Sequence, residues 1–262
     1  MPTTSTRYRG LKWASAATAT TLLLLLASMP TTVSADVVEL DRARPDSGHD
    51  AGPSCPPEMV YIPAANVRLG AAASGPQSLS NPPNPPHFAR LRAFCIDRFE
   101  VSVATYATCP WCVRSGRVDA GLCQDGPDQL PVRCITQLEA GQYCASHGRR
   151  LASSDEWEYA ARGTDQRMYP WGNALPSTAF ALPREVGADP HDVSPFGVLG
   201  MQGNIAEWVS DRAQNSGGRP CGVVRGASLL TRVDAQWPAS VVFAKCDLPT
   251  PLVGVRCAMD AP

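Results

Sequence analysis

The cysteine content constrains the fold of this chain more than any other feature. The 262 residues contain ten cysteines, and all of them lie after residue 54. An even number of cysteines in an exported chain is typical of a set of disulfide bonds. The segment that carries them is long enough to bury a hydrophobic core, so the disulfides should add to a core and not replace it. The cysteines stand at positions 55, 95, 109, 112, 123, 134, 144, 221, 246 and 257.

Residues 1–35 predict a cleavable signal peptide. A basic segment precedes five consecutive leucines (residues 22–26), and the small residues Val33–Ala35 fit a cleavage site before Asp36. The apolar run is far shorter than the roughly 20 residues that a spanning helix needs, so no membrane anchor is expected after cleavage. We expect export, either to a periplasm or to the exterior.

The remaining chain is expected to form one domain. Residues 36–57 are polar and read as a flexible linker, whereas apolar residues become frequent over 58–260, where there is no internal repeat. The near balance of 23 basic and 24 acidic residues gives no electrostatic reason to expect nucleic acid or an anionic membrane as a partner.

Regular structure should be sparse. Short strands are predicted at 59–62, 67–69 and 94–97, because each is an apolar or alternating run that stops at a turn or at Pro63. A surface loop is expected at 74–87, which holds five prolines, and a long packed loop at 169–196.

Two helices are predicted more firmly than the strands. Each begins with a capping box, in which a hydroxyl residue is followed three positions later by glutamate, and each is followed by a glycine that can end it. The boxes are Thr136 with Glu139 and Ser153 with Glu156, and the glycines are Gly148 and Gly163.

A series of short motifs spans nearly the whole domain. They include Asp155-Glu156-Trp157-Glu158-Tyr159, Tyr169-Pro170-Trp171-Gly172, Gly203-Asn204-Ile205-Ala206-Glu207-Trp208, Arg225-Gly226-Ala227-Ser228 and Gly254-Val255-Arg256-Cys257. In this order they resemble the formylglycine-generating enzyme (sulfatase-modifying factor) family. The resemblance implies an α+β, loop-rich, disulfide-bonded single domain related to C-type lectins. It also implies that Trp157, Trp171 and Trp208 are core residues and that Cys144 pairs with Cys257.

The copper site of that family is not matched. The resemblance implies that two cysteines after the Arg-Gly-Gly-Ser motif bind Cu(I) and that the enzyme oxidises a substrate cysteine to formylglycine with oxygen. Here the two positions are Thr231 and Gln236, neither of which is the soft ligand that Cu(I) requires. No cysteine occurs from Ser228 to Lys245, so copper is not expected.

The other cysteines leave alternatives open. Cys221 and Cys246 flank the copper segment and are expected to pair with each other, because the family partner of the Cys246 position falls at Ala161. The remaining six cysteines allow 15 pairings. Cys109 and Cys112 form a C-x-x-C, which is either a redox pair or part of a loop held by structural disulfides; no strand–helix–strand pattern surrounds it, which favours the structural interpretation.

The resemblance also raises two further kinds of metal site. A calcium ion is possible at Gly203, Ile205 and Glu207, but Gly200 stands where family members carry an additional side-chain ligand, and calcium needs six to eight oxygens. A related branch binds non-haem iron through histidines of an additional helical domain. The four histidines here form no local pair at ligand spacing; they are His49, His87, His147 and His191.

These residues favour a non-catalytic binding or scaffold module whose ligand is a protein, a peptide or a glycan. Two alternatives remain. One is a formylglycine-generating or related oxidoreductase that acts on a protein cysteine through a variant site. The other is a thiol–disulfide protein that acts through Cys109 and Cys112.

Overall fold

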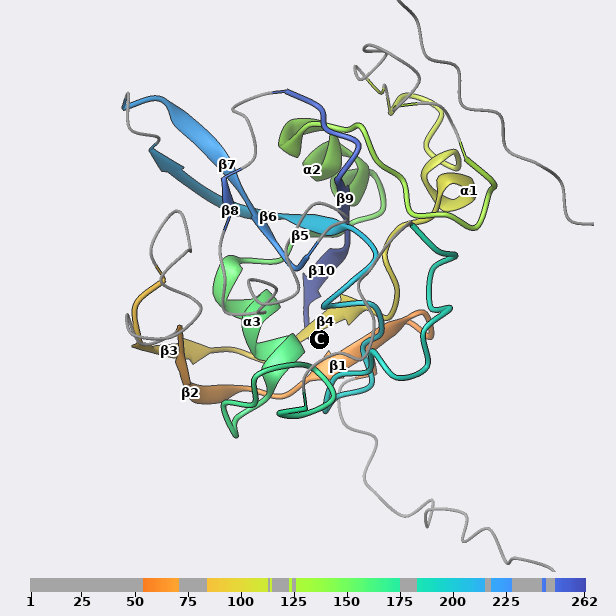
Figure 1. The fold of residues 1–262 in the computed structure, drawn as a ribbon. Coiled ribbons are helices and arrows are strands. Elements are labelled where there is room, and N and C mark those ends of the chain that lie inside the picture. The colour runs from red at the N-terminus through yellow and green to blue at the C-terminus, as the bar shows by residue number, and fades with distance from the viewer. Residues whose placement is uncertain are drawn as a thin grey trace, which may run out of the picture. The chain divides into compact units, whose positions relative to one another are not determined.

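The computed structural model describes residues 54–70, 84–112, 114, 123, 126–174, 183–214, 218–227, 242–243 and 248–262 (Figure 1). All of them belong to one compact unit, His49–Pro262. The predicted signal peptide, nearly all of the linker and the positions Thr231, Gln236 and Cys246 lie outside the described residues. Within the described ranges, no helix is both long enough and apolar enough to cross a membrane.

One four-stranded antiparallel sheet joins the two ends of the domain. Its strand order is β1-β4-β10-β5, so the first and the last strand of the domain both pair with β4. Figure 1 shows the chain ending beside β1 and β4. The strands are β1 (Met59–Ile62), β4 (Phe94–Asp97), β10 (Cys257–Asp260) and β5 (Arg150–Leu151).

A second four-stranded sheet has the order β8-β7-β6-β9, in which β6 and β9 run parallel and the other pairs antiparallel. Arg256 is the single residue between β9 and β10, so the chain passes there from one sheet to the other. The strands are β6 (Ala206–Gln214), β7 (Pro220–Arg225), β8 (Val242–Phe243) and β9 (Val253–Val255). A separate hairpin pairs β2 (Ala65–Leu69) with β3 (His87–Leu91).

Both predicted capping boxes are present, and they start α2 (Gln137–Ser146) and α3 (Ser154–Arg162). The glycines after these helices, Gly148 and Gly163, have positive φ angles of 68° and 65°. Glycine adopts this backbone conformation without the steric cost that a side chain brings. The predicted helices are therefore confirmed; the short α1 (Val103–Tyr106) was not predicted.

The predicted strands at 59–62, 67–69 and 94–97 are also confirmed, and the described parts of 169–196 contain neither helix nor strand. The strands β3 and β5–β10 were not predicted. The expectation that Trp171 is a core residue is wrong in part: Trp157 and Trp208 are buried, whereas Trp171 is half-buried and stacks on Tyr169 with ring centroids 5.1 Å apart.

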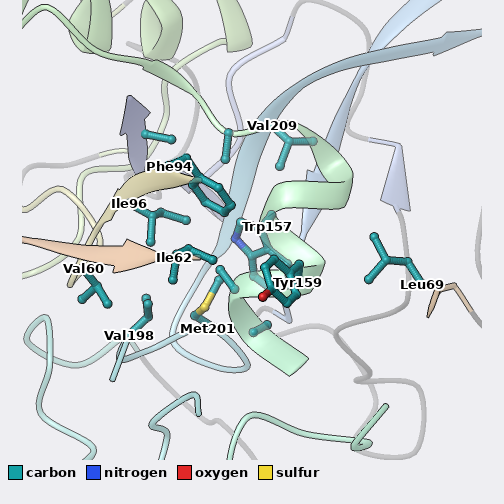
Figure 2. Close-up of a cluster of buried hydrophobic side chains, with 14 of the residues drawn as sticks. Val60, Ile62, Leu69, Phe94, Ile96, Trp157, Tyr159, Val198, Met201 and Val209 are labelled. Atoms are coloured by element: carbon teal, nitrogen blue, oxygen red, sulfur yellow. The ribbon is translucent and has the colours of Figure 1, made fainter. Parts of the chain in front are cut away.

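A hydrophobic cluster lies between α3 and the strands of the first sheet (Figure 2). The indole of Trp157 projects from α3 toward Phe94 and Ile62, and Met201 reaches the same space from the loop before β6. A second cluster forms around Tyr143 of α2 and Trp208 of β6. The two clusters together fix α2, α3 and the strand β6 relative to one another.

A buried carboxylate attaches α3 to the rest of the fold. Glu158 is fully buried, and its Oε1 accepts hydrogen bonds from the backbone nitrogen of Gly70 and from Arg162, while its Oε2 lies 3.2 Å from Nη1 of Arg225. Burial alone would raise the pKa of Glu158, but Arg225 and Arg162 hold that pKa below its ordinary value. The carboxylate is therefore ionised and balances two buried guanidinium groups.

Four disulfides connect described cysteines, and they settle the pairing of the six cysteines that the sequence left open. Cys144–Cys257, the bridge implied by the family resemblance, is also present. Because Cys55 is bonded to Cys95 of β4, the chain is already attached to the domain two residues before the end of the predicted linker. The bridges are Cys55–Cys95, Cys109–Cys112, Cys123–Cys134 and Cys144–Cys257.

We predict that Glu158→Gln destabilises the protein by roughly 3–5 kcal/mol, because it leaves two buried guanidinium groups without a counter-charge. Urea denaturation measures the change in the free energy of unfolding. The control is Glu58→Gln, which removes a carboxylate that is 57% exposed beside Arg149, and it should cost no more than about 1 kcal/mol. Equal losses of unfolding free energy in the two variants would contradict the idea that burial makes the loss of Glu158 costly.

Removal of Cys144–Cys257 should cost far more than removal of Cys109–Cys112. The first bridge closes a sequence separation of 113 residues and the second a separation of 3. Loop-closure entropy then gives about 5 kcal/mol for the first and about 2 kcal/mol for the second. Urea denaturation of the two double serine variants measures both costs, and a larger loss for the Cys109–Cys112 variant would overturn the expectation.

Candidate functional site

The segment that would carry the copper ligands runs between two paired strands. The strand β7 ends at Arg225, and β8 returns beside it with Val223 opposite Phe243. Thr231 and Gln236 fall between these strands, outside the described residues, so the structure leaves their expected roles untested. The sequence places a hydroxyl group and an amide group at these two positions.

No described cysteine is a free thiol. Cys221 on β7 is disulfide-bonded and buried. The expected Cys221–Cys246 bridge stays a prediction, because Cys246 lies outside the described residues. None of the cysteines that the structure describes is therefore available as a soft ligand for Cu(I).

Cys109 and Cys112 are bonded to each other in a turn that follows α1. In redox-active C-x-x-C pairs, a thiol at the start of a helix has a lowered pKa because of the helix dipole. Here the helix that precedes the pair, α1, ends before Cys109, and no described helix begins at either cysteine. Trp111, between the two cysteines, is 70% exposed.

The calcium set expected from the resemblance includes the carboxylate of Glu207, which accepts hydrogen bonds from two buried side chains in this structure. Its Oε2 accepts hydrogen bonds from Nε1 of Trp157 at 2.6 Å and from Nε of Arg256 at 3.0 Å. Its Oε1 accepts from Nε and Nη2 of Arg256 at 3.1 and 2.8 Å. The single Nε–H of Arg256 is shared between both oxygens, so three N–H donors occupy about three of the four acceptor sites of the carboxylate. The calcium set of Gly203, Ile205 and Glu207 stays a prediction.

Arg256 supplies the positive charge beside Glu207 and also connects several segments of the chain. Its Nη1 donates to the carbonyl oxygen of Asp97 at 2.9 Å, and its Nη2 donates to that of Leu199 at 2.8 Å. Nη2 also lies 3.9 Å from Oε2 of Glu100. Both Arg256 and Glu207 are buried, so the pair is shielded from water and strongly coupled.

A small cavity of about 30 Å³ lies on the other side of Glu100. It has room for about two water-sized particles. We call it the acidic cavity, and its lining includes Glu100, Arg184, Asp189, Asp192 and Asn204. Sequence reasoning did not identify this cavity, because its residues come from segments far apart in the chain and belong to no single motif.

The acidic cavity explains why position 200 is glycine. Gly200 has a φ of +70°, and a Cβ atom there would lie 2.7 Å from Oε2 of Glu100. That distance is too short for real atoms, so a side chain at position 200 would require the Glu100 carboxylate to move. The positive φ also favours glycine at this position.

Burial changes the acidity of the carboxylic acids in this region. It raises the pKa of Glu100 to about 7, and the charge of Glu207 adds to the increase. Burial likewise raises the pKa of Asp192 and of Asp97 to about 6. Perturbed acids of this kind often mark functional sites, although ion-pair networks perturb acids as well.

The described histidines do not come together. His87 contacts Asp155 through Nε2 at 3.1 Å, and His147 lies 3.3 Å from Thr108. His191 is an exposed loop residue, and His49 lies outside the described residues. Within the described ranges, no three histidine, cysteine or acidic side chains gather as a metal-binding group.

A shallow groove of about 360 Å³ runs between Trp111 and one face of α2. Gln142, Ala145 and Ser146 form its other wall. The groove combines an exposed aromatic ring with an amide and a hydroxyl group. It is large enough for a small ligand.

Comparison with known proteins identifies the family to which this domain belongs. Residues 47–261 match the sulfatase-modifying factor enzyme 1-like domain. The chain is 34% identical over 155 residues to the inactive C-alpha-formylglycine-generating enzyme 2 of Mus musculus, which covers 51% of this chain and 50% of that protein. It is 38% identical over 112 residues to the hercynine oxygenase of Mycolicibacterium thermoresistibile, which covers 38% of this chain and 25% of that protein. The chain thus spans half or less of the length of these two curated relatives.

The solved structures agree with this assignment at the level of the fold. PvdO from Pseudomonas aeruginosa superposes with a TM-score of 0.63 at 21% identity, over 77% of this chain and 94% of that one. The α+β, loop-rich, C-type-lectin-like fold expected from the sequence is confirmed. Since the family match covers most of the chain, the protein belongs to the sulfatase-modifying factor enzyme 1-like domain family.

Proposed function

We propose that this protein is an exported, non-catalytic binding or scaffold module that shares its family's fold without the copper chemistry. One observation carries the proposal: Thr231 and Gln236 stand at the two positions where the family's copper thiolates are expected. A hydroxyl and an amide are hard ligands, and Cu(I) binds soft ones. The predicted signal peptide and the four disulfides between described cysteines support export into an oxidising compartment.

The state of the cysteines supports the same conclusion. Cys221 flanks the copper segment and is disulfide-bonded, so it is not a thiolate that could substitute for the missing ligands. A relative named as an inactive formylglycine-generating enzyme is consistent with a non-catalytic role. Another relative is named as a hercynine oxygenase, and a shared fold does not by itself carry function.

The groove between Trp111 and α2 is the surface that we propose for recognition. The Cys109–Cys112 disulfide restricts the backbone of the turn that presents Trp111, so this turn loses little freedom when a ligand binds. A sugar ring has an apolar face that stacks on an aromatic ring and hydroxyl groups that pair with amides and hydroxyls. Gln142 supplies an amide, and Ser146, whose hydroxyl donates to the carbonyl oxygen of Tyr143, can supply only an acceptor. The chemistry of the groove therefore favours a neutral glycan.

We predict that the purified chain binds no Cu(I) tightly when it is titrated against a competing chelator, and that it does not convert a sulfatase-type cysteine peptide to formylglycine with copper and oxygen present. The matched variant carries Thr231→Cys together with Gln236→Cys. It should bind one Cu(I), because it restores two soft ligands at the family's positions.

Tight binding of one Cu(I) by the unmodified chain, or turnover of the peptide, would overturn the proposal. It would mean that a different pair of thiols, such as Cys221 and Cys246, is reduced in the folded protein. The formylglycine-generating or related oxidoreductase function would then be the better description.

Recognition at the groove can be tested separately with immobilised neutral oligosaccharides. We expect at least one to bind and Trp111→Ala to weaken that binding roughly tenfold, the size of one lost aromatic stacking contact. The control is Phe88→Ala, which removes a ring that is 83% exposed on β3 and should leave binding unchanged. Binding that Trp111→Ala does not weaken would place recognition elsewhere, and binding of peptides alone would replace the glycan.

A further inference from the structure

We infer that a pocket between α2 and the start of the first sheet binds a primary ammonium group, carried by a small amine or by the end of a lysine side chain. The pocket has a volume of about 110 Å³. Sites for drug-sized ligands measure about 300–1,000 Å³, so this one suits a single short chain. We call it the Phe99 pocket, and its lining includes Glu58, Asp97, Phe99, Tyr143 and Arg149.

The charges of the Phe99 pocket favour a cation. Three carboxylates line it, those of Glu58, Asp97 and Glu100, and the described part of its lining contributes one basic side chain, Arg149. The guanidinium of Arg149 contacts Glu58 through Nη2 and Asp97 through Nη1, the latter at 2.7 Å. Because one guanidinium group cannot balance three carboxylates, the lining keeps an excess of negative charge. That excess attracts a positively charged ligand.

Glu100 adds a buried acceptor to this lining. The residue is 3% exposed, and among the described residues its Oε2 has no hydrogen-bond partner. Arg256 approaches this oxygen at 3.9 Å, but its guanidinium is paired with Glu207 at 2.8 Å. A buried carboxylate oxygen without a hydrogen bond is costly. An ammonium group donates three hydrogen bonds, so a single ligand can satisfy this acceptor and others in the pocket.

The apolar part of the lining suits the methylene stem of such a ligand. Phe99 is 38% exposed, and Val101 and the ring of Tyr143 line the pocket with it. Aromatic rings attract ammonium groups through their faces, and the stems of basic chains pack on apolar surface. The hydroxyl of Tyr143 donates to the carbonyl oxygen of Thr105 at 3.4 Å, which leaves its lone pairs as acceptors.

An organic cation fits this pocket better than a metal ion does. Both oxygens of Asp97 already accept hydrogen bonds, Oδ1 from Arg149 at 2.7 Å and Oδ2 from the backbone nitrogen of Cys257 at 2.8 Å. In the part of the chain that the structure describes, no three histidine, cysteine or acidic side chains converge as metal ligands. A metal ion needs several oxygens around one point, whereas an alkylammonium makes separate contacts with its charge and its stem.

The test is a nuclear magnetic resonance titration of the full, disulfide-bonded, ¹⁵N-labelled chain with n-butylammonium chloride at constant ionic strength. It is run at about pH 8, because the pKa of Glu100 is about 7 and that of Asp97 about 6, whereas the amine is still protonated. We expect saturable shifts of the amide signals of the Phe99 pocket. The dissociation constant should be on the order of 10⁻³ M for so small a ligand.

Two further probes separate the charge of the ligand from its source. n-Butanol has the same stem without the charge, and it should bind roughly tenfold more weakly than butylammonium. Nα-acetyl-lysine amide carries the same ammonium group on a peptide unit. Tighter binding of this probe than of butylammonium identifies a lysine side chain as the ligand, and equal binding identifies a free amine; both outcomes support the pocket.

Variants at the rim test the assignment of the residues. Glu58→Gln should weaken the binding of butylammonium roughly tenfold, and Glu58→Lys should abolish it, because the pocket would then hold its own ammonium group. Both variants should fold, since the side chain of Glu58 is 57% exposed. Phe99→Leu keeps an apolar side chain without the ring and should weaken binding roughly threefold. The control is Asp165→Asn, which removes a 57% exposed carboxylate paired with Arg167 outside the pocket.

Absence of saturable shifts at the Phe99 pocket would overturn the inference. So would n-butanol that binds as tightly as butylammonium, or binding that Glu58→Gln and Phe99→Leu leave unchanged, since recognition would then not depend on this charge or this ring. Trp111→Ala should leave the binding of butylammonium unchanged, because Trp111 lines the groove on the other face of α2. The ammonium site and the glycan groove can therefore fail independently.

Discussion

The ion pair between Arg256 and Glu207 is the contact on which most of this structure depends. Glu207 lies on β6 of the second sheet, and Arg256 is the residue between the two sheets. Through its remaining donors, Arg256 binds the end of β4 and the loop before β6, and through Trp157 the carboxylate reaches α3. Both sheets and one helix thus meet at two buried side chains. Their charges are tolerated in the interior only because each satisfies the other.

This arrangement distinguishes two neighbouring sets of acidic residues. The Glu207 carboxylate of the Gly-Asn-Ile-Ala-Glu-Trp segment is paired with the protein's own Arg256. One oxygen each of Glu100 and Asp192 has no hydrogen-bond partner in the structure, and both residues line the small cavity nearby. Glu207 thus holds the two sheets together, whereas Glu100 and Asp192 form part of a cavity wall.

Local signals in the sequence were sufficient for the parts of the fold that are local. The capping boxes at Thr136 and Ser153 predicted both longer helices, because the hydrogen bonds that start a helix lie within four residues. Strands such as β9 and β10 were missed, because three or four residues beside a buried arginine show no alternation and their partners lie far away in sequence. The motifs supplied the fold class that these strands complete.

The candidate sites also divide into features that depend on residue type and features that depend on residues far apart in the sequence. The expected loss of the copper ligands could be read from the family resemblance together with the residue types at Thr231 and Gln236. The acidic cavity could not, because Glu100 and Asp192 are 92 residues apart and come together only through the fold. The proximity of Gly200 to Glu100 could likewise not be predicted, because Glu100 lies far away in the sequence.

The pairing of the first and last strands with β4 also determines when this protein can fold. The sheet β1-β4-β10-β5 stays incomplete until residues 257–260 have left the ribosome, and so does the Cys144–Cys257 bridge. Arg256, which lies between the two sheets, leaves the ribosome just before residues 257–260. The domain must therefore be synthesised up to its last strand before this sheet and this bridge can form. During that interval Cys144 lacks its native partner and is open to incorrect pairing.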